Sequence, residues 1–273
     1  MADAATCDAT DCVIELRKLW TVFGPQVVHR DISLCVKRGE ILSLVGGSGS
    51  GKSTMLRQML GLESPTRGDV LVFGHSLITG DPAELRRLRN RWGVLFQEGA
   101  LYSALSVFEN VATPLRELKA LDEGLIRDLV ILKLEMVGIE ARHAEKMPSA
   151  LSGGMIKRAA FARAIVMDPK ILFCDEPSAG LDPIVASAID DLILSLRDAM
   201  GMSIVVVTHE LESAFRIADR ICVLDRGNIL MIGTVEEVKA STNERIQNLL
   251  NRRTEQEILD PEEYLKRLTA VNG

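Results

Sequence analysis

The sequence predicts an α/β fold with a mainly parallel β-sheet, and three observations support this. Segments with the composition of strands alternate with segments of helical periodicity, as they do when helices connect parallel strands. Three short apolar runs have the composition of buried strands, namely 41–45, 171–174 and 203–208. The first run is followed by a glycine-rich loop and then by a helical segment, 54–60, which ends at Gly61.

The N-terminal part is expected to add antiparallel strands to this core. Residues 13–19 and 31–36 alternate apolar and polar side chains, the pattern of strands with one buried and one exposed face. Residues 220–224 and 229–232 flank the turn sequence 225–228 and predict a β-hairpin. The 273 residues are enough for one large domain, or for a domain that carries an insertion.

Helical periodicity dominates the middle of the chain and its last 33 residues. We interpret residues 98–165 as a helical insertion in a domain that spans residues 1–240. Residues 241–273 are predicted to form a C-terminal extension of two short amphipathic helices, the second of which starts at Asp260-Pro261. These helices either cover their own domain or contact a second copy or a partner subunit.

The composition narrows the possible function classes. The net charge of −6 argues against a protein that binds polyanions such as nucleic acids nonspecifically. The sequence has no apolar run of the roughly 18 residues that a membrane-spanning helix needs, and its N-terminus lacks the pattern of a secretory signal. The five cysteines are scattered and none lies in a C-x-x-C pair, so we expect reduced thiols in a cytosolic protein and no zinc site.

Residues 46–53 fit the P-loop pattern G-x-x-x-x-G-K-[ST] at every fixed position. The glycines let backbone N–H groups converge on one point, and the following helix adds partial positive charge there. Lys52 can reach a terminal phosphate, and the Ser53 hydroxyl can ligate Mg²⁺. A flexible Gly/Ser loop without function is disfavoured because a strand and a helix flank the motif. The residues expected to contact a nucleoside triphosphate are Gly46, Gly47, Ser48, Gly49, Ser50, Gly51, Lys52, Ser53 and Thr54.

Two carboxylates, Asp175 and Glu176, end the apolar run 171–174 in the form of a Walker B strand. Ligands of open α/β sheets bind at this carboxyl end of the strands. Asp175 is expected to hold Mg²⁺, directly or through water, and Glu176 to polarise the water that attacks the γ-phosphate. An Asp-Glu pair alone would more often be two solvated side chains. The P-loop in the same chain is what favours a catalytic role for this pair.

The segment Leu151-Ser152-Gly153-Gly154 forms a second loop of small residues at the start of a helical run, 155–164. A helix N-terminus of this kind is a natural phosphate site. An isolated Ser-Gly-Gly would usually be a turn, but here Ser152 lies 23 residues before Asp175, and the helix leads into the carboxylate-bearing strand.

Taken together, these motifs resemble the nucleotide-binding subunit of ABC transporters over roughly residues 12–240. The resemblance implies a RecA-like P-loop NTPase core with an N-terminal antiparallel β subdomain and a helical insertion. It implies that Phe23 stacks on adenine and that Gln97 ligates Mg²⁺ and senses the γ-phosphate. Asp182 is implied to be the D-loop residue facing a partner copy, and His209 to contact the γ-phosphate. The implied catalytic residues are Glu176, His209, Gln97 and Lys52, and the implied metal ligands are Ser53, Gln97 and Asp175.

The resemblance also implies a homodimer in which two cassettes pack head to tail around two ATP molecules. Ser152, Gly153 and Gly154 would then serve the ATP of the partner copy. Contacts made only when the γ-phosphate is present would close the dimer, and hydrolysis would release it. The chain departs from the family pattern at Met155, where the signature usually has Gln. We expect a modest effect on ATP affinity, because only a side-chain hydrogen bond is lost.

The variant signature L-S-G-G-M, together with residues 97–102, 107–111 and 114–117, is most similar to the ATPase of Mla-type lipid transporters. That similarity implies a membrane permease, an MCE-domain partner, and a phospholipid or related hydrophobic substrate. It implies a position on the cytoplasmic face of the inner membrane. Residues 101–111 would dock a coupling helix of the permease.

Two other function classes are weaker. A soluble ABC ATPase that acts on nucleic acid or ribosomes commonly has two cassettes, coiled coils or zinc insertions, and a P-loop kinase or GTPase would leave the signature and His209 unexplained. One basic cluster could bind nucleic acid or anionic lipid headgroups, but we interpret it as a solvated helix face. Its members are Arg86, Arg87, Arg89 and Arg91.

Overall fold

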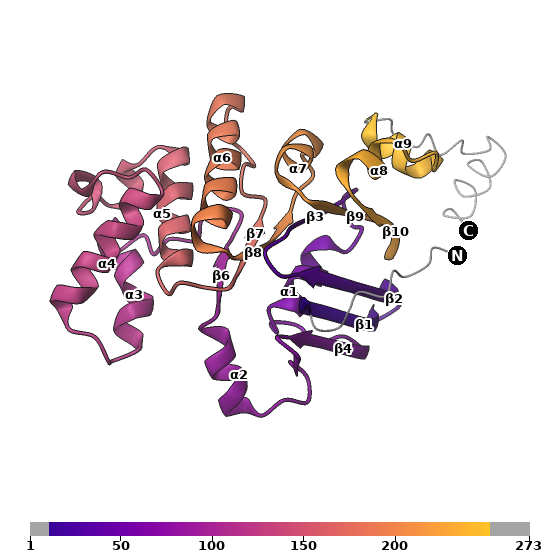
Figure 1. Cartoon of the computed structure of the whole chain (residues 1–273), viewed down its shortest axis with the longest axis horizontal. Helices are drawn as coiled ribbons and strands as arrows, with labels where there is room; N and C mark the ends of the chain where they lie inside the picture. The colour runs from indigo at the N-terminus through magenta and orange to yellow at the C-terminus, as the bar shows by residue number, and fades with distance from the viewer. Residues whose placement is uncertain (1–10, 252–273) are drawn as a thin grey trace, which may run out of the picture.

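Residues 11–251 are described by the computed structural model, and a six-stranded sheet of order β10-β9-β3-β8-β7-β6 forms their centre (Figure 1). Neighbouring strands pair in parallel except in the β9–β10 hairpin. The mainly parallel sheet and the hairpin predicted from the sequence are thereby confirmed. The strands are β3 (Ile41–Gly46), β6 (Trp92–Leu95), β7 (Ile171–Asp175), β8 (Ser203–Val207), β9 (Arg220–Asp225) and β10 (Asn228–Gly233).

The register of this sheet brings the carboxyl ends of its central strands to one edge. Asp175 at the end of β7 is aligned with Val207 of β8, and Val207 is aligned with Leu44 of β3. The loops that follow these three strands therefore leave the sheet side by side. The side chains of β3 and β8 are buried on both faces, which explains why these strands are mostly apolar, apart from Ser43 and Ser203, rather than alternating.

A smaller antiparallel sheet of order β2-β1-β4-β5 lies below the central sheet in Figure 1. Its strands alternate buried and exposed side chains, as the N-terminal sequence predicts. Helix α1 (Lys52–Met59) lies between the two sheets, because Met55, Leu56 and Met59 belong to the same buried cluster as side chains of both. The strands are β1 (Cys12–Phe23), β2 (Gln26–Lys37), β4 (Arg67–Val72) and β5 (His75–Ser76).

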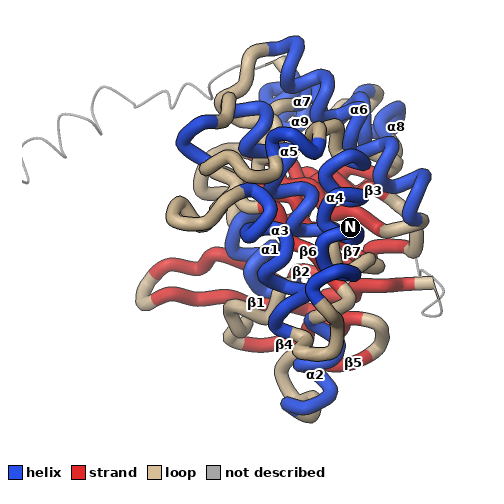
Figure 2. The backbone as a smooth tube through the Cα atoms, turned by 90° about the vertical axis from the view of Figure 1, so that its left-hand side faces the viewer, coloured by secondary structure: helices blue, strands red, loops and turns tan. Residues whose placement is uncertain are grey.

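The middle of the chain forms the helical layer seen in front of the central sheet in Figure 2. Val111, Val130 and Phe161 join its helices in one core, which continues onto the central sheet. Ser106 and Glu109 form a capping box at the start of α3, and Asp122 caps α4, so the sequence itself fixes where these helices begin. The elements are α3 (Val107–Glu117), α4 (Glu123–Met136), two short 3₁₀ turns (Ala141–His143 and Pro148–Ala150) and α5 (Gly153–Ile165).

Five further helices complete the described structure: α2 (Pro82–Arg89), α6 (Pro183–Met200), α7 (Leu211–Ile217), α8 (Val235–Lys239) and α9 (Glu244–Leu250). Ile246 of α9 is buried in a cluster with Val45 and Val238, so this first helix of the predicted C-terminal extension covers its own domain. The second predicted helix, from Asp260-Pro261, lies outside the described residues. Between residues 11 and 251, none of the helices has both the length and the apolar character needed to cross a bilayer.

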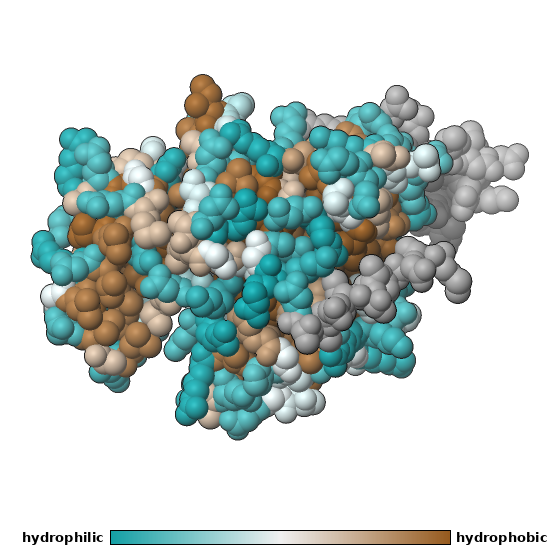
Figure 3. Space-filling view, in the orientation of Figure 1, coloured by the Kyte–Doolittle hydropathy of each residue, from teal (hydrophilic) through white to brown (hydrophobic). Residues whose placement is uncertain are grey.

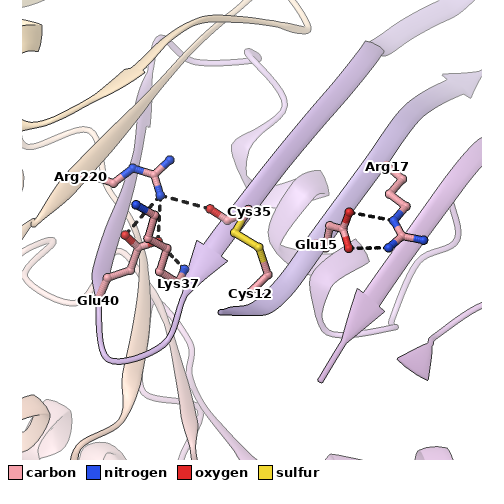
Figure 4. Close-up of a disulfide and its surroundings, with 7 residues drawn as sticks. All are labelled: Cys12, Glu15, Arg17, Cys35, Lys37, Glu40 and Arg220. Carbon is pink, nitrogen blue, oxygen red and sulfur yellow. Dashed lines mark hydrogen bonds and ion pairs between the residues drawn. A yellow bond between two sulfur atoms is a disulfide. The ribbon is translucent and has the colours of Figure 1, made fainter. Parts of the chain in front are cut away.

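One expectation about the cysteines is wrong. Cys12 of β1 and Cys35 of β2 form a disulfide, with their Cα atoms 5.7 Å apart (Figure 4). The spacing of 23 residues gave no hint of this pair, because only the antiparallel register of β1 and β2 brings the two positions together. Cys174 and Cys222 are free and buried, as expected, and burial raises the pKa of the Cys222 thiol to about 12. Cys7 lies outside the described residues.

Candidate functional site

The predicted P-loop connects β3 to α1 at the carboxyl edge of the central sheet. Gly46 has a φ of 156°, and a Cβ at this position would lie 2.2 Å from the carbonyl oxygen of Leu224, so only glycine fits where the loop leaves the strand. Gly51, the N-cap residue of α1, has a φ of 105° and offers no side chain to the helix. The first N–H groups of α1 therefore lack a side-chain cap and remain available to an anion.

Lys52 places its ammonium group at this loop. Its Nζ atom donates to the carbonyl oxygens of Gly46 at 2.8 Å and of Gly47 at 3.0 Å. Burial lowers the pKa of Lys52, whereas the carboxylates of Glu176 and Asp175 raise it. The structure thus brings the predicted phosphate-binding cation and the two predicted carboxylates into one electrostatic cluster.

The carboxylates themselves follow from the end of β7. Burial raises the pKa of the Asp175 carboxyl, and the neighbouring Glu176 raises it further, while Arg57, Lys52 and Lys157 oppose the shift. Carboxylate oxygens in such a place favour a hard cation, and the Ser53 hydroxyl and Gln97 amide supply ligands of the same class. The donor types at these three predicted positions therefore fit Mg²⁺.

Glu176 is paired with His209. The Nδ1 atom of His209 lies 2.8 Å from Oε2 of Glu176, and the same oxygen accepts a longer hydrogen bond, 3.4 Å, from the His209 backbone N–H. Glu176 is held in the left-handed region with a φ of 50°, which is uncommon for a residue other than glycine. Two residues that were predicted separately, at the ends of β7 and β8, thus form one hydrogen-bonded unit.

The backbone of the segment that follows β6, which contains Gln97, lies close to Glu176. The Nζ atom of Lys157, on α5, donates to the carbonyl oxygen of Gln97 and also, at 3.1 Å, to that of Glu176. Gln97 therefore lies next to the catalytic candidates, with its side chain exposed.

The predicted signature loop lies apart from this cluster. Ser152 is the N-cap of α5, and its hydroxyl accepts a hydrogen bond from the Met155 N–H at 3.3 Å. Ser152 and Gly153 are exposed. Among residues 11–251, no hydrogen bond or ion pair joins residues 152–154 to the P-loop of the same chain.

Comparisons with known proteins identify this constellation. The model of the ABC transporter family matches residues 29–179. The chain belongs to the ABC transporter family. It is 40% identical over 238 residues to the intermembrane phospholipid transport system ATP-binding protein MlaF of Haemophilus influenzae, which covers 87% of this chain and 90% of that protein. It is 38% identical over 240 residues to the probable ribonucleotide transport ATP-binding protein mkl of Mycobacterium leprae, covering 88% and 69% of the two chains.

Solved structures agree with this assignment. The dimeric ATP-binding cassette MJ0796 bound to ADP and Pi superposes with a TM-score of 0.74 at 32% identity, over 81% of this chain and 98% of that one. CbiO1 of Clostridium perfringens, part of the ABC transporter complex CbiONQ, has a TM-score of 0.78 at 30% identity, over 89% and 96%. The chain is an ATP-hydrolysing ABC transporter subunit, and a P-loop kinase or GTPase is excluded.

Two further predicted residues of the ABC cassette lie at the surface. Phe23, at the end of β1, is 45% exposed and so does not pack in the core. Asp182 is the N-cap of α6, where one carboxylate oxygen accepts hydrogen bonds from the N–H groups of Ile184 and Val185, both at 3.1 Å. Contact with adenine and with a partner copy stays a prediction for these two residues.

Sequence reasoning missed a buried polar group beneath the P-loop. His29 is fully buried, and its Nε2 atom lies 3.1 Å from the carbonyl oxygen of Gly51. A carbonyl oxygen only accepts, so Nε2 carries the proton and Nδ1 accepts from the Thr21 hydroxyl at 3.0 Å. Thr21 in turn accepts from the Gln58 amide at 2.7 Å. Polar residues at inward-facing positions of β1 and β2 were the signal that could have revealed this group.

The cassette has a groove of about 720 Å³ beside the segment that follows β6, and the surface is hollowed there between α2 and α3 (Figure 3). Three of the four clustered arginines, Arg86, Arg87 and Arg89, line it, together with Pro114 of α3 and Leu118 directly after that helix. The fourth, Arg91, instead lies over the ring of Phe73, 4.0 Å from its centre. All four arginines are exposed, as a solvated face requires, and three of them also line this groove.

Proposed function

We propose that two copies of this chain bind two ATP molecules head to tail and use hydrolysis to drive a permease that moves phospholipid or a related hydrophobic molecule. The printed names of the MlaF relatives and the signature L-S-G-G-M support the lipid class of substrate. The observation that carries the proposal is the pairing of Glu176 with His209 at 2.8 Å beside the Lys52 ammonium.

Within one site, each group has a distinct task. The N–H groups of the P-loop and the Lys52 ammonium bind the β- and γ-phosphates. Ser53, Gln97 and Asp175 would hold Mg²⁺, which when bound would supply positive charge to the phosphate oxygens. Glu176 accepts a hydrogen bond from the attacking water and polarises it. His209 keeps the Glu176 carboxylate in place through Nδ1 and presents its other ring nitrogen to the γ-phosphate.

The partner copy completes the site with its signature loop. Ser152 and Gly153 are exposed at the start of α5, so their hydroxyl and N–H groups can meet a phosphate that belongs to another chain. Met155 leaves this backbone arrangement unchanged. The dimeric cassette MJ0796 bound to ADP and Pi supports two copies as the working unit.

The groove lined by Arg86, Arg87 and Arg89 is the proposed docking site for the permease. A cytoplasmic helix with acidic residues matches its charge, and Tyr102 and Pro114 offer apolar contact. The cassette would thereby sit on the cytoplasmic face of the inner membrane, next to a permease and an MCE-domain protein. A groove beside Gln97 also lets a docked helix influence the catalytic site.

A pair of variants tests the chemistry. Glu176→Gln keeps the P-loop intact, so ATP binding should stay within about twofold of the parent while turnover falls by at least about a hundredfold. Lys52→Ala removes a charge-assisted contact to phosphate, so the Kd for ATP should rise by at least about tenfold. Nucleotide titration and phosphate release on the full-length chain measure both. Unchanged hydrolysis in Glu176→Gln would remove this residue from its role.

The transport class is tested by purification from detergent-solubilised membranes. A hydrophobic permease in stoichiometric complex with the cassette is the expected outcome. Retention of RNA or ribosomes without a membrane protein would instead favour the nucleic-acid class.

A further inference from the structure

Helix α5 carries a lysine on its buried face. Lys157 is 5% exposed, and its ammonium group donates to two backbone carbonyl oxygens, those of Gln97 and Glu176. These carbonyls belong to segments that follow two different strands, β6 and β7. One side chain therefore joins the helix that begins at the signature loop to both segments that carry catalytic candidates.

A buried ammonium group is costly unless its donors are satisfied, and an apolar side chain would fill the same space without that cost. Burial lowers the pKa of Lys157, while the surrounding acidic groups, among them Glu176, Asp175 and Glu98, raise it. The charged form of Lys157 is therefore stabilised by these acidic groups against the unfavourable effect of burial. A buried lysine that costs free energy in packing, and whose two hydrogen bonds both go to segments with catalytic candidates, indicates a role at the site.

The backbone of Glu176 explains what this contact does. Its left-handed conformation, with a φ of 50°, costs roughly 1–2 kcal/mol and persists only when neighbouring groups hold it. Its N–H donates to the carbonyl oxygen of Val207 at 2.8 Å, and its own carbonyl oxygen accepts from Lys157 at 3.1 Å and from the Ala179 N–H at 3.3 Å. Lys157 is thus the side chain that holds the carbonyl group of a residue whose carboxylate faces His209.

The same helix also holds the segment after Gln97. Arg163 donates to the carbonyl oxygens of Gly99 and Ala100, both at 2.8 Å. A Cβ on Gly99 would lie 3.2 Å from Ile156, so the segment rests directly on the helix. A displacement of α5 would consequently carry Gln97 and Glu176 with it.

We propose that Lys157 is a positioning residue that couples the signature helix to Glu176 and Gln97 of the same chain. This inference rests on the proposed function, in which the first turn of α5 lies on the partner's nucleotide while Glu176 and Gln97 act on the chain's own. Contact of the signature loop with one ATP then sets the geometry around the other. Lys157 is the direct link between the two sites.

Lys133 provides a matched control. It is a lysine of α4 with the same 5% exposure, and its Nζ atom bonds to Asp168, a residue that also has a left-handed φ, 49°. Asp168 precedes β7, whereas Asp175 and Glu176 stand at the other end of that strand. Within residues 11–251, no hydrogen bond or ion pair joins Asp168 to Glu176. Replacing Lys133 therefore removes a buried charge and its ion pair with Asp168 without touching the site.

The test uses the full-length chain in complex with its membrane subunits. Lys157→Met should lower kcat by at least about tenfold with the KM for ATP within about twofold, because the catalytic geometry changes while the P-loop does not. Lys157→Arg, which retains charge and donors, should keep kcat within about threefold of the parent. Lys133→Met should keep both constants within about twofold, although its thermal stability falls.

Two outcomes would overturn the inference. The first is a Lys157→Met variant with the kcat of the parent. The second is a Lys133→Met variant that loses as much kcat as Lys157→Met, since buried charge alone would then account for the effect. Glu176→Gln is measured beside them. If it is inactive while Lys157→Met is unaffected, only the role of Lys157 fails, whereas full turnover in Glu176→Gln contradicts the proposed function itself.

Discussion

At the scale of single residues, the site depends on charges that balance one another. Lys52 and Lys157 approach the carboxylates of Asp175 and Glu176 from two different helices. Burial alone would disfavour the charged form of Lys52, Lys157 and Asp175. Because oppositely charged groups share one cluster, each stabilises the ionised state that the next requires. The triphosphate and Mg²⁺ proposed to bind here would enter a site that already holds charges of both signs.

His29 adds a titratable group directly beneath this cluster. Burial lowers its pKa from the ordinary value of 6.5. Below about pH 6.5 the unfolded chain therefore binds a proton at His29 more readily than the folded chain does. In that window the free energy of unfolding decreases as the pH is lowered. Protonation would also place a hydrogen on Nδ1, where His29 now accepts from Thr21.

We therefore expect His29→Phe to reduce the pH dependence of stability. Urea unfolding at about pH 7.5 and about pH 5.5 gives the difference in unfolding free energy for the parent and for the variant. The variant should show a smaller difference, whatever its absolute stability. A difference equal to that of the parent would mean that His29 does not titrate between folded and unfolded states in this range.

At the scale of elements, the sequence predicted those features of the site that lie within one short segment of the chain. The P-loop, the carboxylates after β7 and the start of α5 are each set by residues within one strand–loop–helix segment. The disulfide between Cys12 and Cys35 depends on the register of two strands, which no local pattern gives. The contacts of Lys157 with Gln97 and Glu176 span 60 and 19 residues, so they too escape a reading of periodicity.

Helix α6 illustrates how one residue can serve its own element and an interface. Asp182 caps the helix with two hydrogen bonds, and the next apolar residue, Ile184, is 82% exposed. Capping alone explains the residue type. The exposed isoleucine lies where Asp182 is proposed to face a partner copy, so it is available for the same contact.

Substitutions at Asp182 can separate these two roles. Asp182→Ala removes the cap and should lower the free energy of unfolding by about 1 kcal/mol. Asp182→Asn keeps the capping oxygen, so stability should be retained, but it loses the charge proposed to face the partner copy. Denaturant unfolding and steady-state ATPase assays distinguish them. If Asp182→Asn matches the parent in both, Asp182 is a cap and nothing more.

At the scale of the whole molecule, the fold keeps two parts of the nucleotide site on separate surfaces. The P-loop lies at the edge of the central sheet, whereas the signature loop opens a helix of the helical layer (Figure 1). Neither surface forms a complete site by itself, since residues 152–154 make no hydrogen bond or ion pair to the P-loop within the described part of the chain. Assembly of two copies is the simplest way to bring the two loops together. The sequence motifs predict such a dimer, whereas the structure describes a single chain.

Gly153→Asp tests this assembly with little risk to the fold. A Cβ at Gly153 would lie 3.4 Å from Leu181, an ordinary contact, and a negative charge in the first turn of α5 favours the helix. The same charge would repel the phosphates of a nucleotide bound to the partner. In a Glu176→Gln background, the parent should dimerise with Mg²⁺-ATP, whereas the Gly153→Asp variant should stay monomeric.

In the proposed arrangement the signature loop contacts the other chain's nucleotide, so the Gly153→Asp monomer should still bind ATP within about twofold of the parent. Light scattering after size exclusion reports the dimer, and nucleotide titration reports the binding. Gly153→Ala, which adds only the Cβ, should dimerise as the parent does. Loss of ATP binding by the isolated Gly153→Asp chain would show that the signature loop acts on its own P-loop, and the head-to-tail arrangement would have to be abandoned.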